Sequence, residues 1–270
     1  MSSRRRALLI ALVGLLIVAL VATAALLRTG RPGHPTVASP YPPQDQPGPV
    51  LLVPGYGGST ASLEVLAEKL RAAGRQATLV SLPGDGTGDL RQAARALDAA
   101  ATAALAGGAR SVDVVGYSAG GVVARIWVRD LAGDRKARRI VTLGTPHHGT
   151  DVAALALAFA PTACPVACRQ LVPGSELLTA LNHGAEAPAG PAWLSVWSTK
   201  DDVVTPAETS RLTGAVDVAL QDVCPGVQVT HADLPTTPLV AGLVLDSLGA
   251  GAIPTPGPAE CIPLQAAGTS

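Results

Sequence analysis

The chain has 270 residues, of which 48% are hydrophobic and 15% are charged, and its formal net charge at pH 7 is zero. This length suits one folded domain with a substantial core, or at most two small ones. No basic block follows the N-terminus, so the charge pattern gives no reason to expect nucleic acid as a partner. We expect the chain to be a monomer.

The N-terminus carries Arg4, Arg5 and Arg6 before an uncharged run at residues 7–27. A run of about 20 apolar residues can cross a bilayer as one helix, and the basic residues on its short side should stay in the cytoplasm. Residues 1–28 are therefore predicted to be a membrane anchor or a signal peptide. The length favours an uncleaved anchor, whereas the small-x-small pattern at residues 22–24 is typical of a cleavage site. Both alternatives place the rest of the chain outside the cytoplasm, membrane-anchored or secreted.

Residues 29–48 are rich in Pro and Gly and show no apolar periodicity, which predicts a semi-extended spacer. From residue 49 to 270, short apolar runs alternate with Ala-rich helical patterns. This alternation predicts a mostly parallel sheet with helices on both faces, and chemistry at the carboxyl ends of its strands. The expected strands are 50–53, 77–82, 111–116, 139–143, 193–197 and 227–230, and the expected helices are 60–73, 89–106, 119–131 and 238–248.

A Gly-x-Ser-x-Gly turn, Gly116-Tyr117-Ser118-Ala119-Gly120, follows the predicted strand at 111–116 and opens the helix at 119–131. Such a turn holds its serine in a strained backbone conformation, so only small residues fit on either side of it. The pattern alone arises by chance, and an ordinary N-capping serine is the alternative. The flanking strand and helix favour Ser118 as a nucleophile.

An acyl-transfer site also needs hydrogen-bond donors for the developing oxyanion. The backbone N–H of Ala119, directly after the nucleophile, is one candidate. The second candidate is the N–H of Tyr56, in the loop 53–58, whose glycines let the backbone approach a substrate closely. A nucleotide-binding loop is a poor alternative, because the Lys-Ser/Thr ending of a P-loop is absent.

Three segments, 53–58, 116–121 and 142–150, together resemble the small bacterial secreted lipases and esterases of the α/β-hydrolase superfamily. These include compact Bacillus-type and actinomycete triacylglycerol lipases. The likeness extends over about residues 49–248. Pro54 departs from the pattern, since many relatives have a histidine there, but the donor needed from this loop is a backbone group. The resemblance implies the α/β-hydrolase fold and an ester or lipid substrate.

In this fold the triad follows the order Ser, Asp or Glu, then His. Of the five histidines, only His231 follows a plausible acid late in the chain, and the resemblance places the base there. His34 lies in the spacer. The resemblance implies that the stretch with His147 and His148 shapes the rim of the active site. These two histidines are expected either to support the catalytic residues from behind or to face the substrate.

The acid is narrowed to two neighbours. An Asp-x-Val-Val pattern with a Pro just beyond it resembles the acid loop of the family, which selects Asp201, with Asp202 as the alternative. The acid accepts the ring N–H of the base and stabilises the imidazolium.

Four cysteines, Cys164, Cys168, Cys224 and Cys261, suit disulfides in an exported chain. Three pairings are possible, and 164–168 with 224–261 avoids crossing and ties the C-terminal tail to the body. A zinc site is the alternative to the disulfides, but it is a weak one because no Cys-x-x-Cys spacing occurs. We expect neither a metal nor a cofactor.

Residues 150–182 form an expected cap insertion with an apolar run at 152–160. The run suits an acyl-binding wall or a lid, and equally an ordinary core helix. The sequence thus predicts a carboxylic ester hydrolase, a lipase or esterase that works through an acyl-enzyme. An envelope acyltransferase on the same fold and a non-catalytic surface binding module are the alternatives. The second is disfavoured because all catalytic parts are present in order.

Overall fold

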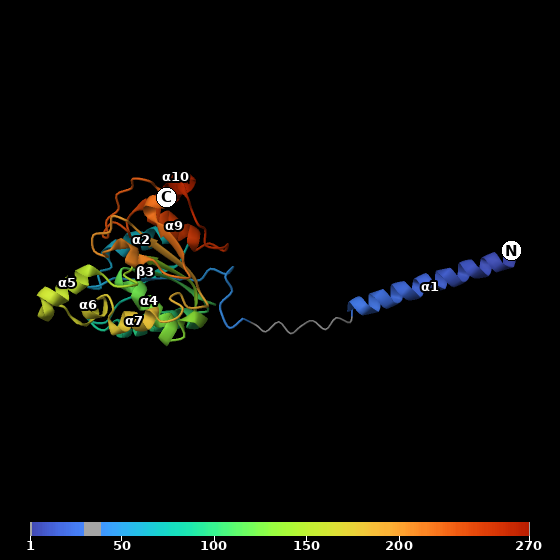
Figure 1. The fold of residues 1–270 in the computed structure, drawn as a ribbon, viewed down its shortest axis with the longest axis horizontal. Coiled ribbons are helices and arrows are strands. Elements are labelled where there is room, and N and C mark those ends of the chain that lie inside the picture. Colours follow the sequence, from blue (N-terminus) through green and yellow to red (C-terminus); the bar gives the residue numbers. More distant parts are fainter. Residues whose placement is uncertain (1, 30–38, 270) are drawn as a thin grey trace. The chain divides into compact units, whose positions relative to one another are not determined.

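A computed structural model describes residues 2–29 and 39–269, with only the backbone of residues 7–11 and 25–29. The chain divides into two compact units, Met1–Ser39 and Pro40–Ser270. Helix α1 (Ser3–Thr29) makes up the described part of the first unit (Figure 1). Residues 30–38, which include His34 and half of the predicted spacer, lie outside the described residues.

Within the described residues, no helix was found that is both long enough and apolar enough to cross a membrane. The anchor or signal peptide at residues 1–28 stays a prediction. Residues 40–49, at the described end of the predicted spacer, form turns and coil before the first strand.

The described part of the second unit contains a six-stranded parallel sheet with the order β2-β1-β3-β4-β5-β6. Strands buried on both faces carry continuous apolar runs, and all four residues of the Val-Leu-Leu-Val strand β1 are buried. The parallel sheet predicted from the alternating pattern is confirmed. The strands are β1 (Val50–Val53), β2 (Ala77–Leu79), β3 (Val112–Tyr117), β4 (Ala137–Leu143), β5 (Ala192–Trp197) and β6 (Val216–Ala219).

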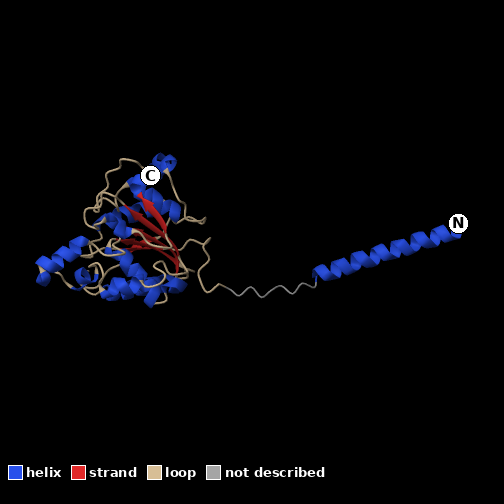
Figure 2. Ribbon diagram, in the orientation of Figure 1, coloured by secondary structure: helices blue, strands red, loops and turns tan. Residues whose placement is uncertain are grey.

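Helices cover both faces of this sheet, as Figure 2 shows. One apolar cluster includes residues of α3 and α4, and a separate cluster on the other face includes residues of α2, α9 and α10. The body helices are α2 (Ala61–Ala72), α3 (Leu90–Ala106), α4 (Ala119–Asp130), α8 (Leu220–Val223), α9 (Pro238–Ser247) and α10 (Cys261–Ala267). Short 3-10 turns lie at Gly133–Arg135, Pro161–Ala163, Ala207–Ser210 and Pro258–Glu260.

The strand predicted at residues 227–230 is wrong. These residues are coil, and the last strand of the sheet is β6, Val216–Ala219. The carbonyl of Val229 accepts a hydrogen bond from Ser198 Oγ at 2.6 Å, and other side chains satisfy the neighbouring backbone. Val229 is buried, which accounts for the apolar pattern of the segment without a strand.

The segment predicted to be a cap, residues 150–182, contains α5 (Asp151–Phe159), α6 (Val166–Gln170) and α7 (Glu176–Asn182). Its inner residues join the cluster that includes α3 and α4, while Leu155 and Phe159 on α5 are exposed. The cap is thus core on one side and an open apolar surface on the other. Disulfides join Cys164 to Cys168 at α6 and Cys224 to Cys261 between α8 and α10, which is the non-crossing pairing that we favoured.

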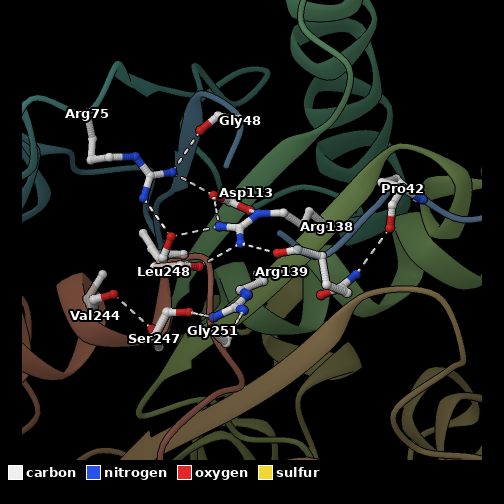
Figure 3. Close-up of polar contacts among 12 residues, drawn as sticks. Pro42, Gly48, Arg75, Asp113, Arg138, Arg139, Val244, Ser247, Leu248 and Gly251 are labelled. Carbon is white, nitrogen blue, oxygen red and sulfur yellow. Dashed lines mark hydrogen bonds and ion pairs between the residues drawn. The ribbon is translucent and has the colours of Figure 1, made fainter. Parts of the chain in front are cut away.

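Arginines join the amino ends of β3 and β4 to the C-terminal end of α9 (Figure 3); Arg138 is fully buried and Arg75 is partly exposed. Arg75 and Arg138 both bind the Asp113 carboxylate, and both donate to the carbonyl of Leu248 at 2.8 Å. Cations at the last carbonyls of a helix are stabilising. These contacts therefore fix the C-terminal end of α9 against the sheet.

Candidate active site

Ser118 lies in a tight turn between β3 and α4, with φ 54° and ψ −125°. A positive φ at a non-glycine residue is strained, as expected for this kind of turn. A Cβ at Gly116 would lie 2.6 Å from the backbone N of Gly121, and one at Gly120 would collide with the carbonyl of Val53. Glycine is therefore required on both sides of Ser118.

The loop after β1 passes directly against Ser118. A Cβ at Gly55 would lie 2.9 Å from the Cβ of Ser118 and 3.4 Å from its Oγ. Tyr56, the predicted donor, is the next residue along this loop. Ala119 is the first residue of α4, so its N–H has no acceptor within its own helix, and the helix N-terminus favours negative charge. Both predicted oxyanion donors thus come from backbone next to the serine.

Asp201 and His231, the predicted acid and base, are in direct contact. Nδ1 of His231 lies 2.8 Å from Oδ2 of Asp201, and both side chains are buried. The other carboxylate oxygen accepts the N–H groups of Val203 at 2.9 Å and Val204 at 2.7 Å, which fix its orientation. Asp202 is exposed and does not meet the ring: its Oδ1 accepts the backbone N–H of His231 at 3.2 Å.

Tyr117 connects this pair to the nucleophile turn. Its hydroxyl donates to the backbone carbonyl of His231 at 3.1 Å, and its ring stacks on the imidazole with centroids 5.0 Å apart. Because Tyr117 directly precedes Ser118, the contact brings the histidine segment to the strand end that carries the serine. Sequence reasoning gave Tyr117 no role of its own.

Gly144 was also missed. It follows β4 with φ +53°, and a Cβ there would collide with Leu234 and lie 3.0 Å from Oδ2 of Asp201 and 3.2 Å from Nδ1 of His231. The acid–base pair is therefore packed against bare backbone. A glycine at the carboxyl end of a central strand was the available signal.

His147 does not face a substrate, as one interpretation of the sequence had it, because it is fully buried. Its Nε2 lies 3.2 Å from Oγ1 of Thr142, which donates in turn to Oγ of Ser195 at 3.1 Å. Burial, with the nearby charge of Arg125, holds the pKa of His147 well below its usual value. This second serine–histidine group has no solvent access, since all three side chains are buried.

His148 is partly exposed and ties its loop to two others. Its Nε2 lies 3.0 Å from Oε1 of Glu186, and its Nδ1 lies 3.2 Å from the carbonyl oxygen of Thr209. Burial would raise the pKa of Glu186, but hydrogen bonds from His148 and Thr213 lower it. Across the described residues, no group of three or more His, Cys, Asp and Glu side chains is placed to hold a metal ion.

The cap begins at the acid loop. The side chain of Thr150 donates to the carbonyl of Val203 at 2.6 Å, accepts the N–H of Thr205 at 3.1 Å, and caps α5. Exposed apolar side chains occur on the acid loop, on the loop after β1 and along α5. We call this set the apolar rim: Tyr56, Val152, Leu155, Phe159 and Val203.

Comparison with known proteins agrees with this architecture. Residues 48–162 match the family profile described as alpha/beta hydrolase fold. The mature lipase BlEst2 of Bacillus licheniformis superposes with a TM-score of 0.64 and 19% identity, covering 82% of this chain and 96% of that one. The chain has the α/β-hydrolase fold. This confirms the fold that the resemblance of the three sequence segments implied.

Lipase B of Aspergillus fumigatus is similar to this chain, with a TM-score of 0.63 and 18% identity. The match covers 82% of this chain but 61% of the Aspergillus protein, so the chain spans less than two thirds of that relative. No curated protein sequence matches the chain. At these identities, the likeness to the two lipases is one of fold.

Proposed function

We propose that this α/β-hydrolase is a carboxylic ester hydrolase, a lipase or esterase, with Ser118, Asp201 and His231 as its triad. The observation that carries the proposal is the 2.8 Å contact between His231 and Asp201, joined through Tyr117 to the strained turn of Ser118. A buried acid–base pair and a serine held in a strained turn at a strand end are the parts that acyl transfer requires.

The chemistry follows from these positions. Nδ1 of His231 binds Asp201, which leaves Nε2 to take the proton of Ser118 Oγ as the oxygen attacks the ester carbonyl. The N–H groups of Tyr56 and Ala119 stabilise the oxyanion. His231 then protonates the departing alcohol. Water, deprotonated by the same imidazole, attacks the acyl-enzyme and releases the carboxylic acid.

The apolar rim supports a substrate with an apolar acyl chain. Phe159 is 84% exposed and Leu155 is 55% exposed, at the helix that Thr150 ties to the acid loop. Exposed apolar residues grouped beside a site favour apolar ligands. A series of p-nitrophenyl esters from acetate to palmitate tests this, with kcat/KM expected to rise beyond the shortest chain. Highest activity on acetate would argue against an acyl-binding rim.

The triad is tested with a fluorophosphonate probe, which labels an activated serine covalently. The native protein should be labelled, and mass spectrometry of the labelled peptide should identify Ser118. Ser118→Ala should abolish labelling, whereas Ser195→Ala, in the buried serine–histidine group, should retain it. A folded native protein that resists the probe, or a label on Ser195, would contradict the proposal.

We further propose that the domain works outside the cytoplasm, either anchored by residues 1–28 or released from them. The two disulfides support this location, since such bonds persist in oxidising compartments. Expression of the full chain, followed by fractionation and thiol alkylation, tests it. Free thiols and a cytosolic fraction would contradict it.

A further inference from the structure

His231 is held on a segment without regular structure. The preceding residues 227–230 form coil rather than the expected strand, and turns follow up to α9. A strand end is fixed by its ladder of backbone hydrogen bonds, whereas a loop residue needs other partners. A base displaced by about 1 Å from its reacting geometry can lose a hundredfold in rate. The structure must therefore supply other contacts that fix this histidine.

Two side chains from different segments of the chain bind the two backbone groups of His231. The carboxylate of Asp202 accepts its N–H at 3.2 Å, and the hydroxyl of Tyr117 donates to its carbonyl at 3.1 Å. The Tyr117 ring also stacks on the imidazole at an angle of 29°. Asp201 binds Nδ1 at the edge of the ring. The backbone N–H, the backbone carbonyl, one face of the ring and Nδ1 of His231 therefore each have a partner.

Tyr117 is suited to act as a permanent donor. Burial, followed by the negative charges of Asp201, Asp202 and Asp233, raises its pKa to about 12, so the hydroxyl keeps its proton at any ordinary pH. Tyr117 is also the last residue of β3, next to Ser118. The same strand end thus fixes both the nucleophile and the base.

We propose that Tyr117 and Asp202 are positioning residues that clamp the backbone of His231 and aim its imidazole at Ser118. The inference rests on the proposed function, because it takes His231 as the base. In this proposal Asp202, the neighbour of the acid, fixes the base by accepting its backbone N–H. Neither residue touches the reacting atoms.

Paired variants separate the contacts. Tyr117→Phe keeps the stacked ring and removes the hydroxyl, and Tyr117→Leu removes both. Asp202→Ala removes the acceptor, whereas Asp202→Asn retains an acceptor oxygen without the charge. Asp246→Asn, an exposed carboxylate on α9, is the control for loss of one negative charge.

With p-nitrophenyl butyrate as the probe substrate, we expect kcat to fall about tenfold in Tyr117→Phe and Asp202→Ala, and about a hundredfold in Tyr117→Leu, at nearly constant KM. Asp202→Asn should recover most of the activity. The double variant Tyr117→Phe/Asp202→Ala should lose less than the product of the single losses, because both act on one residue. The control should match the native protein.

Proton NMR of the Nδ1–H of His231 tests the clamp without activity. The native protein should show a downfield resonance from the hydrogen bond to Asp201, which should broaden in Tyr117→Leu and Asp202→Ala and persist in Asp246→Asn. Native kcat and an unchanged resonance in Tyr117→Phe and Asp202→Ala would overturn the clamp. If the resonance responds but a fluorophosphonate never labels Ser118, the proposed function fails and the clamp stands.

Discussion

Arg138 and Asp113 form a two-point ion pair with no solvent exposure at the amino ends of β4 and β3. Nε of Arg138 lies 2.9 Å from Oδ1 of Asp113, and Nη2 lies 2.6 Å from Oδ2 (Figure 3). Arg75 shares the same carboxylate at 2.7 Å. A single buried acid therefore compensates two guanidinium groups.

Removing this acid should destabilise the fold strongly. Asp113→Asn leaves a buried guanidinium without its counterion, and breaking such a pair reduces the free energy of unfolding by about 3–5 kcal/mol. Glu64→Gln is the control, because its pair with Arg71 is more than 40% exposed on both sides and should contribute at most about 1 kcal/mol. Urea unfolding followed by tryptophan fluorescence measures both. A loss below about 1 kcal/mol in Asp113→Asn would contradict the prediction.

Gly144→Ala should reduce activity more than it reduces stability. The new Cβ would press on Leu234 and on the contact between Asp201 and His231, and a displacement of about 1 Å there corresponds to about a hundredfold loss of kcat. Gly74→Ala is a matched control: Gly74 also has positive φ, but nothing lies within 4 Å of its Cβ position. Both variants should lose about 1–2 kcal/mol of backbone stability. Native kcat in Gly144→Ala would show that the pair tolerates the methyl group.

Buried His147 should make the fold sensitive to mild acid. Its pKa is held well below 6.5 in the folded state, so below pH 6.5 the unfolded chain binds a proton that the folded chain does not. Stability from this residue is therefore complete above about pH 6.5 and decreases as the pH falls below that value, by on the order of 1 kcal/mol for each pH unit.

His147→Gln should remove that slope. Urea unfolding at pH 7.5 and 5.5 should show a pH-dependent loss of stability that is larger in the native protein than in the variant, by on the order of 1 kcal/mol. The rest of the chain is identical in the two proteins, so the difference isolates His147. Equal losses would mean that His147 takes up its proton in the folded state.

Most of the fold, the serine turn and the acid–base pair could be predicted from patterns in the sequence. Fully apolar strands and a Gly-x-Ser-x-Gly turn are local features, and the strand and helix around Ser118 lie within one residue of their predicted ends. The order of the triad along the chain selected His231, and the resemblance of the Asp-x-Val-Val loop to the acid loop of the family selected Asp201 over Asp202. The structure brings His231 and Asp201 into contact.

Contacts between distant segments could not be inferred in this way. Tyr117 and His231 are 114 positions apart, and no periodicity relates them. The segment Val-Gln-Val-Thr at 227–230 was interpreted as a strand because alternating β-branched residues suit one, but in coil the same alternation serves only to bury Val229. His147 was expected at the rim, but it folds inward to Thr142, whose hydroxyl offers it a partner.

The two disulfides should differ in what they contribute to stability. Cys164 and Cys168 are 4 positions apart, and Cys224 and Cys261 are 37 apart. Loop-closure entropy then gives about 2 kcal/mol for the first bond and about 4 kcal/mol for the second. Urea unfolding of Cys164→Ser/Cys168→Ser and Cys224→Ser/Cys261→Ser compares them. A larger loss from the short loop would mean that packing of the cap, rather than chain entropy, dominates.

If Asp201 is the acid, the same substitution at Asp201 and at its neighbour Asp202 should have very different effects on kcat. In Asp201→Asn, the amide presents an N–H where the imidazole Nδ1–H needs an acceptor, so kcat should fall by about 10⁴-fold. Asp202→Asn keeps an oxygen for the backbone N–H of His231 and should stay close to native. Ester hydrolysis and the rate of fluorophosphonate labelling of Ser118 measure both, with circular dichroism to check folding. A larger loss in Asp202→Asn than in Asp201→Asn would make Asp202 the acid, and the contact seen between Asp201 and the ring would then be structural.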